Sequence, residues 1–320
     1  FGCNVPAIMA SRTIENRKSR LITMLVNPLM SCSARLPIYL LLVGAFFPNN
    51  GSLILLLIYS IGILLAVLLA RLFSRFLVKG DDTPFVMELP QYHIPQAKTV
   101  LLHVWERLKG FIIKAGTILF LATVIMWILS SIGNTGSGIG FVEDSNDSIM
   151  AILGGILAPI FAPLGFGKWQ PVAASISGFS AKESIVSTMG VLANVAGDDA
   201  EDTMIVGAAI KAWFPTAVAA FSFLLFNLLD SPCLAAIATM AQQLQSRKWF
   251  WFAILYQNLF AYAVSLIVYQ LGGLVLGAVA FNVWTIVAAV LLVFMLFMLF
   301  RPDPYKDQKS YTRSSVEAAS

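Results

Sequence analysis

The chain has 320 residues, of which 58% are hydrophobic and only 12% are charged, and its mean hydropathy is +0.80. Soluble domains carry about 25% charged residues, so this composition excludes an ordinary water-soluble protein and predicts a membrane protein. The formal net charge is +4. The basic residues are clustered between apolar segments, which is typical of loops on the inner side of a membrane and does not indicate a nucleic-acid partner.

Long apolar segments predict an all-α fold, a multi-pass bundle of membrane helices, because about 20 apolar residues cross a bilayer as a helix. The segments fall near residues 21–47, 52–77, 111–132, 149–166, 172–192, 205–245 and 249–300, and the last should divide in two at QLGGLVLGAVAFN. The loops FPNNG, NTGSGIGFVEDSND and NVAGDDAEDT contain no Lys or Arg, whereas the intervening loops and the C-terminal tail are basic. This alternation predicts that the basic loops and the tail are cytoplasmic.

Two of the apolar segments are interrupted by proline and polar residues, NPLMSCSARLP at 27–37 and NLLDSPCLAAI at 227–237. A shift of 200 residues places Ser31 on Ser231 and brings Cys32 within one position of Cys233. A second pair, FGCNVPAIMAS and SGFSAKESIVS, aligns at an offset of 176. The pairing predicts two repeats of opposite topology whose broken helices meet near the middle of the membrane, since helix breaks in lipid are tolerated only inside the protein.

The order of these features predicts five parts. They are a first repeat at 1–50, spans and a cytoplasmic loop at 51–135, a second repeat at 149–246, a helix pair at 249–300 and a disordered cytoplasmic tail at 301–320. Within the loop at 80–110, TVLLHVWERLKG has apolar residues at helical spacing, which predicts a helix in the membrane interface anchored by Trp105. Because the chain does not begin with Met, we expect it to be a piece of a longer protein.

The breaks carry side chains that suit a divalent metal ion. The candidate ligands are Cys3, Asn4, Ser31, Cys32, Ser180, Glu183, Asp230, Ser231 and Cys233. Thiol, hydroxyl and carboxylate donors together favour a borderline metal such as Fe²⁺ over Na⁺ or Ca²⁺. Helix N-termini and Lys182 oppose a cation, so Glu183 and a deprotonated cysteine would have to offset them.

Structural roles compete with ligation at several of these positions. Ser180 and Glu183 have the S-x-x-E spacing of a capping box, which predicts a helix that begins near Ala181. Pro6 suits the first turn of another helix. Asp230 is either functional or a cap for the helix after Pro232, and the cysteines are either ligands or buried packing residues. Lys182 is expected either to extend toward the membrane interface or to pair with a carboxylate.

Six stretches resemble the membrane part of the FeoB family, the prokaryotic ferrous iron transport proteins B. They are GCNVPAIMASR, NPLMSCSARLPIY, FVMELP, HVWERLKGFIIKAGTI, SGFSAKESIVSTMGVL and SPCLAAIATM. The resemblance implies that the repeats are gates, here 1–47 and about 170–245, and that the protein takes up Fe²⁺ across the bacterial inner membrane. It also implies that Cys3, Cys32 and Cys233 line the ion pathway.

The family has an N-terminal GTPase domain that uses GTP and Mg²⁺, but no G-x-x-x-x-G-K-[ST] phosphate loop occurs in this sequence. We therefore expect no enzymatic activity and no cofactor in this chain, with Fe²⁺ as its transported substrate. The implied partners are the GTPase domain, membrane lipid, small cytoplasmic Feo proteins and further copies of the chain.

Other classes of function compete with iron transport. A carrier for another divalent metal, or for an organic solute such as a nucleoside, would use similar paired hairpins, and the organic carrier would line them with aromatic and amide side chains. An intramembrane enzyme with Ser180 as nucleophile needs a base within reach. Both histidines, His93 and His103, fall in the predicted cytoplasmic loop, which argues against the enzyme.

Overall fold

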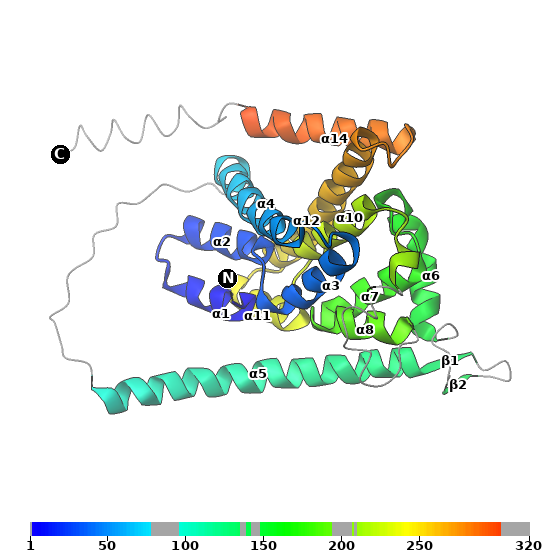
Figure 1. The fold of residues 1–320 in the computed structure, drawn as a ribbon. Helices are drawn as coiled ribbons and strands as arrows, with labels where there is room; N and C mark the ends of the chain where they lie inside the picture. The colour runs from blue at the N-terminus through cyan, green and yellow to red at the C-terminus, as the bar shows by residue number, and fades with distance from the viewer. Residues whose placement is uncertain are drawn as a thin grey trace, which may run out of the picture.

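The computed structural model describes residues 2–77, 96–134, 139–141, 148–193, 207 and 210–301. Expectations for 80–95, for the acidic loop near 198–202 and for the tail at 302–320 lie outside these residues. The described chain is almost entirely helical (Figure 1), which confirms the all-α class. One antiparallel hairpin, β1 (Ile132–Asn134) with β2 (Ile139–Phe141), was not predicted and lies within a predicted loop.

Short helices joined by breaks make up the N-terminal part of the chain. They are α1 (Asn4–Ala10), α2 (Arg17–Val26), α3 (Leu36–Phe46) and α4 (Gly51–Leu72), the last of which continues into a π-helical turn at Phe73–Leu77. Asn16 begins α2 because its side chain accepts hydrogen bonds from the backbone N–H groups of Lys18 and Ser19. Pro28 lies in the 3₁₀ turn that follows α2, where its missing N–H prevents a regular continuation of the helix.

A single long helix, α5 (Ala97–Ser131), follows the first undescribed segment. It joins the predicted surface helix around Trp105 to the predicted apolar segment at 111–132, so the two are one element and not two. Figure 1 shows α5 along one side of the molecule, where it packs on α6, α7 and α11. Trp105 is 60% exposed, as expected for a side chain that contacts the membrane interface.

The middle of the chain turns sharply between two helices. The elements are α6 (Ile149–Phe161), a 3₁₀ turn at Ala162–Leu164, α7 (Trp169–Ser180) and α8 (Ser184–Leu192). The apolar segments 149–164 and 169–180 are bent by 103°. Gly165 makes this turn possible because its φ is +90° and because a Cβ there would lie 2.2 Å from Cε2 of Tyr269.

The last part of the chain contains both well-buried and largely exposed helices. They are α10 (Ala217–Leu229), α11 (Leu234–Leu244), α12 (Arg247–Ile267), the short α13 (Gly273–Val275) after a π-helical turn, and α14 (Val283–Phe300). Thr216 caps α10, and Asn282 forms a capping box with Thr285 at the start of α14. The interruption between α12 and α14 confirms the predicted division of the final apolar segment.

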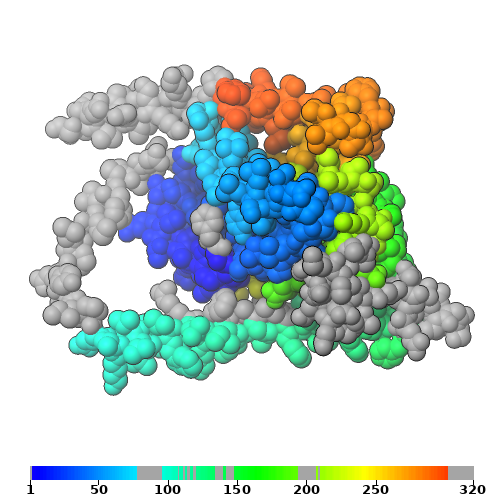
Figure 2. Space-filling model, in the orientation of Figure 1, coloured from blue at the N-terminus to red at the C-terminus, as the bar shows by residue number. Residues whose placement is uncertain are grey.

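Five helical segments among the described residues are long and apolar enough to cross a membrane. They are Arg17–Phe46, Gly51–Leu77, Ala217–Leu244, Arg247–Val275 and Val283–Phe300, and the bent pair at 149–180 makes a sixth if counted as one span. In the most apolar window of Ala217–Leu244, 78% of the residues are buried inside the protein, against 11% for Val283–Phe300. The protein is therefore a multi-pass membrane protein in which α10 is buried in the interior, whereas α14 lies at the periphery (Figures 1 and 2).

An aromatic cluster fixes α10 against the turn after α6. The ring of Phe166 lies 5.1 Å from that of Phe223, and the ring of Phe161 lies 5.2 Å from that of Phe226, centroid to centroid. Both contacts are edge-to-face, the arrangement that the ring quadrupoles favour. This packing holds α10, and the helix break that follows it, in the protein interior.

Candidate functional site

All three cysteines occupy the residue that immediately precedes a helix. Cys3 precedes α1, Cys32 precedes the 3₁₀ turn that leads into α3, and Cys233 precedes α11. Each has an extended ψ between 135° and 162°, and none of the three side chains caps its helix by a hydrogen bond. The backbone is thus unwound at each thiol, as the prolines and small residues of these stretches predict.

The breaks that carry the cysteines lie close to one another. The Gly2 carbonyl accepts hydrogen bonds from the backbone N–H and the hydroxyl of Ser33, at 3.1 and 3.0 Å, which joins the start of α1 to the break before α3. α1 also packs on α11. Cys233 is close enough to Cys32 and Cys3 for a charge on one sulfur atom to act on another. Three segments far apart in the sequence therefore bring their thiols to one region.

The cysteines differ in exposure and form no disulfide, since all three thiols are free. Cys3 is exposed, whereas Cys32 and Cys233 are half-buried. We expect N-ethylmaleimide to modify Cys3 several times faster than Cys32 and Cys233 in the detergent-solubilised protein, because only an accessible thiolate reacts. Peptide mass spectrometry over a time course measures the three rates, and faster modification of Cys233 than of Cys3 would contradict this arrangement.

A buried ion pair ties two of the helix breaks together. The Nζ atom of Lys182 lies 2.6 and 2.7 Å from the two carboxylate oxygens of Asp230. Their side chains are 1% and 0% exposed. Lys182 lies in the break at 181–183 between α7 and α8, and Asp230 ends α10. The carboxylate therefore does not cap the helix after Pro232, and the expectation that Lys182 pairs with a carboxylate is confirmed.

Arg35 adds a second buried cation beside this pair. Its side chain is fully buried, and Nη1 donates hydrogen bonds to the carbonyls of Pro28 and Met30, both at 3.2 Å. These bonds satisfy carbonyls that the break after α2 leaves free. The Nε and Nη2 atoms have no hydrogen-bond partner among the described residues. Arg35 is close enough to Lys182 and Asp230 to act on their charges, so the region holds more positive than negative charge.

The predicted polar residues at the breaks are mostly buried. The Ser31 hydroxyl donates to the Tyr39 hydroxyl at 3.2 Å, and the Ser231 hydroxyl accepts from Nδ2 of Asn258 at 2.8 Å. Asn4 is 7% exposed at the start of α1. Asn258 was not among the predicted site residues, although the pair Gln257–Asn258 within an apolar helix was an available signal. Intramembrane polar side chains of this kind mark functional regions.

Two predictions are wrong: the capping box formed by Ser180 and Glu183, and the alignment at an offset of 176. Ser180 does not begin a helix: it is the last residue of α7, and its hydroxyl donates to the Ser177 carbonyl at 2.7 Å. α8 begins at Ser184, and Glu183 precedes it without a capping bond from its side chain, which is exposed. The capping box is therefore absent. The second alignment is also displaced, because α1 begins at Asn4, and its partner helix begins four residues after the position aligned with Asn4.

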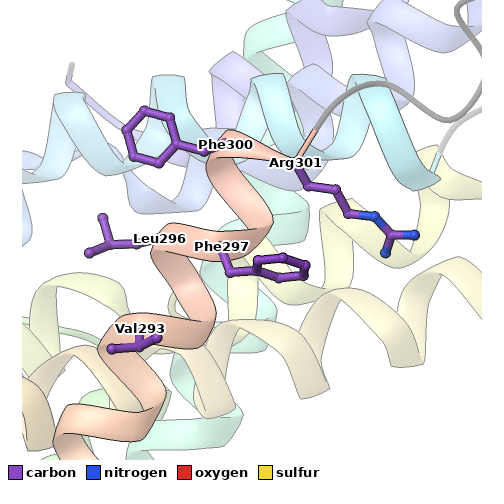
Figure 3. A pocket seen from close by; sticks show the side chains of 5 residues that line it. All are labelled: Val293, Leu296, Phe297, Phe300 and Arg301. Atoms are coloured by element: carbon purple, nitrogen blue, oxygen red, sulfur yellow. The ribbon is translucent and has the colours of Figure 1, made fainter.

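The donors do not form a ready-made metal site. Within the described part of the chain, no three His, Cys, Asp or Glu side chains are grouped closely enough to hold a metal ion. An apolar pocket of about 580 Å³ lies on α14 instead (Figure 3), lined by Val293, Leu296, Phe297, Phe300 and Arg301. Its lining lacks thiols and carboxylates, so it is unsuited to a metal ion.

Comparison with known families gives two matches. The Gate family model, described as nucleoside recognition, matches residues 1–46 and 112–247, which is more than half of the chain. A second model, described as ferrous iron transport protein B C terminus, matches residues 55–107. No solved structure matched the chain significantly.

Curated relatives match most of the chain. The Fe(2+) transporter FeoB of Staphylococcus aureus (strain MSSA476) is 40% identical over 274 residues, which cover 86% of this chain and 40% of that protein. FeoB of Methanocaldococcus jannaschii is 40% identical over 278 residues, with the same coverage. A fusion of Fe(2+) transport protein A with FeoB from Porphyromonas gingivalis is 38% identical over 312 residues, covering 85% of this chain and 37% of the fusion protein.

The chain thus spans about 40% of the length of the relatives it matches. The Gate match covers the regions that hold the three cysteines and the Lys182–Asp230 pair. The shorter match covers α4 and the start of α5. The chain therefore belongs to the Gate family and is related to the membrane part of the FeoB proteins.

Proposed function

We propose that this chain is the membrane permease part of a GTPase-coupled transporter that carries Fe²⁺ into the bacterial cytoplasm. The observation that carries the proposal is the meeting of three free thiols, each at a helix break, with a buried carboxylate inside a multi-pass membrane protein. Sulfur and oxygen donors together suit a borderline divalent ion. The curated relatives are named Fe(2+) transporters, which supports the same substrate.

In this proposal the two interrupted regions, 1–50 and 149–246, act as opposed gates. The breaks at 30–32 and 230–233 fall at corresponding positions when the sequence is shifted by 200 residues, which supports an internal repeat. Binding sites of repeat-built transporters lie where the broken helices of the two repeats meet. The route for the ion would pass Cys3, Cys32 and Cys233 and then Asp230, with Asn4, Ser31, Ser231 and Ser180 as further polar groups along the broken helices. Exposed Glu183 would contact the ion only at an entrance.

The proposed partners follow from the length of the relatives and from their names. A GTPase domain that uses GTP and Mg²⁺ would lie in the part of the protein that this chain does not cover. A small cytoplasmic Feo protein would be a second partner, and the fusion relative, which joins Fe(2+) transport protein A to FeoB, supports this. The C-terminal tail would be cytoplasmic, because the basic loops alternate with loops that have no Lys or Arg. The membrane would be the bacterial inner membrane, as the resemblance to the FeoB family implies.

Uptake by the full-length protein in lipid vesicles tests the proposal. We expect anaerobic Fe²⁺ uptake when GTP is supplied, and we expect the double variant Cys32→Ser/Cys233→Ser to lower its rate by roughly tenfold or more, because hydroxyls replace soft thiolate ligands. Trapped chelator absorbance measures the rate. Thr239→Ser in α11 is the matched control, since the Thr239 hydroxyl bonds only to the Ala235 carbonyl of its own helix, at 2.8 Å, in the described structure.

Wild-type uptake rates in the double variant, with Thr239→Ser also unchanged, would overturn the ligand role of the thiols. Adding a nucleoside or Mn²⁺ in excess separates the alternatives. Inhibition by the nucleoside and not by Mn²⁺ would favour an organic-solute carrier. This alternative agrees with the description of the Gate family model as nucleoside recognition. Uptake of Mn²⁺ in place of Fe²⁺ would point to another divalent metal.

A further inference from the structure

Among the described residues, Asp230 is the one fully buried carboxylate near the cysteines, and the ammonium group of Lys182 already occupies it. Asp230 is 0% exposed, and both of its oxygens accept from the same ammonium group, at 2.6 and 2.7 Å. Asp230 is also three residues from Cys233 and adjacent to Ser231. A metal ion that reached these donors would therefore meet a carboxylate whose charge is already neutralised.

The charges around this carboxylate explain why an incoming dication is opposed. Lys182 and Arg35 supply two positive charges, and Asp230 supplies the single negative one. While Lys182 remains in place, the group repels a cation. If Lys182 moves away, Asp230 and Arg35 balance each other, and the repulsion of the dication is largely removed. Electrostatic interactions are strong in this water-poor interior, so the position of one side chain decides whether the site accepts a cation.

We propose that Lys182 is a tethered cation that holds the place of the transported metal ion on Asp230, and that the ion must displace it to pass. This inference rests on the proposed function and deepens it. A divalent ion has twice the charge of an ammonium group and can draw further ligands from the neighbouring thiols, which offsets the advantage that the tether gives to Lys182.

The ammonium group of Lys182 has a second partner that does not depend on the carboxylate. Nζ of Lys182 lies 5.6 Å from the centre of the Phe179 ring, within the range of a cation–π contact. Phe179 is in the last turn of α7. The aromatic contact is therefore already present beside the carboxylate, and it could still partner the ammonium group after a metal ion takes Asp230.

Displacement of Lys182 would also loosen the contact between two gate elements. The pair connects the break at 181–183 to the end of α10, 48 residues further along the chain. When the metal ion takes the carboxylate, that connection is lost and the positive charges of the ion and of Lys182 repel each other. Ion occupancy is thereby coupled to separation of α7–α8 from α10–α11, the kind of bistable element that switching requires.

Fe²⁺ binding to matched variants of the full-length protein tests the inference. The assay is anaerobic equilibrium dialysis in detergent with excess Mg²⁺, which saturates nucleotide-associated sites. Lys182→Met removes the competing charge and should lower the Kd for Fe²⁺ by about tenfold or more, the order seen when one member of a close charge pair is removed. Lys182→Arg keeps the charge and can form a bidentate bond with the carboxylate, so it should raise the Kd.

Because the two variants should change the Kd in opposite directions, a loss of folding cannot produce the expected result. Lys182→Arg retains the ion pair and should fold even if Lys182→Met does not, and a purely structural role of Lys182 would not make any variant bind Fe²⁺ more tightly. Asp230→Asn should weaken binding, and Lys182→Met should lower the Kd by a smaller factor in the Asp230→Asn background than in the wild type, because only charge repulsion and no competition for the carboxylate is then removed. Lys168→Met and Lys168→Arg are controls, because exposed Lys168 donates to the Ala212 carbonyl and should leave the Kd unchanged.

The inference is overturned if Lys182→Arg binds Fe²⁺ as tightly as, or more tightly than, the wild type. It is overturned as well if Lys182→Met lowers the Kd by the same factor with and without the Asp230 carboxylate. Its failure is separate from that of the proposed function, which depends on wild-type uptake. If the wild type takes up Fe²⁺ but the variants do not show the expected order of Kd values, iron transport stands and the role of Lys182 is rejected. If the Kd values follow the expected order but no uptake occurs, the metal site stands and the transport proposal is rejected.

Discussion

Replacing Asp230 with Ala should lower the free energy of unfolding by about 3–5 kcal/mol, because the Lys182 ammonium would be left buried without its partner. The present pair is enclosed, with side chains 1% and 0% exposed, so water cannot take over the role of the carboxylate. Arg35 adds to the loss, since a second cation lies nearby and the only buried anion described in this region would be gone. Thermal unfolding in detergent, followed by tryptophan fluorescence, measures the effect as a lower Tm.

The double variant Lys182→Met/Asp230→Leu is the informative control for this prediction. Replacing both members of a buried ion pair by apolar residues is often neutral or stabilising, so we expect the double variant to regain most of the stability that Asp230→Ala loses. A Tm for Asp230→Ala equal to that of the wild type would show that the carboxylate is not compensating a buried charge. An equal decrease in Tm in the single and double variants would show that Asp230 stabilises the protein through its packing and not through its charge.

Gly154→Ala should destabilise the protein by about 1–3 kcal/mol, the usual cost of forcing an extra methyl group into a packed interface. A Cβ at Gly154 would lie 2.7 Å from the backbone carbonyl oxygen of Trp169 and 3.3 Å from Cβ of Ala173. A backbone atom cannot move aside as the end of a side chain can, so α6 and α7 would have to separate. Small residues at helix contacts in membranes permit such close approach.

The adjacent glycine provides a matched control in the same helix. A Cβ at Gly155 meets nothing within 4 Å, so Gly155→Ala should be neutral or should stabilise α6 by up to about 1 kcal/mol through its better helix propensity. Both variants are compared by thermal unfolding in one detergent. Equal Tm values for the two variants would argue against the close crossing of α6 and α7.

Local features of the sequence were sufficient to predict the helical class and the main breaks. Long apolar segments predicted membrane helices, and Pro28 and Pro232 marked interruptions that the structure places beside Cys32 and Cys233. Proline removes a backbone hydrogen bond within a single helical turn, so such a break can be located from the local sequence alone. The same holds for the division between α12 and α14, where glycines occur together.

Long-range contacts explain what the sequence did not reveal. The spacing of Ser180 and Glu183 fits a capping box, yet α7 continues to Ser180 and α8 begins only at Ser184. Ala181 is extended, and Lys182 and Glu183 form a turn. In this arrangement Lys182 contacts Asp230, 48 positions away, and a local pattern carries no information about such a partner. The polar pair Gln257–Asn258 was visible in the sequence, but its partner was not, because the hydrogen bond from Asn258 joins α12 to Ser231 in the break after α10.

The continuity of α5 has a mechanical consequence. A helix of 35 residues is about 52 Å long, whereas the hydrocarbon layer is about 30 Å thick. With no joint between Ala97 and Ser131, the stretch around Trp105 cannot lie flat on the bilayer while residues 111–131 cross it upright. Either the entire rod leans, or some 20 Å of it projects into water as a stiff lever, and a force applied at its tip would travel undiminished to the β1–β2 hairpin at the other end.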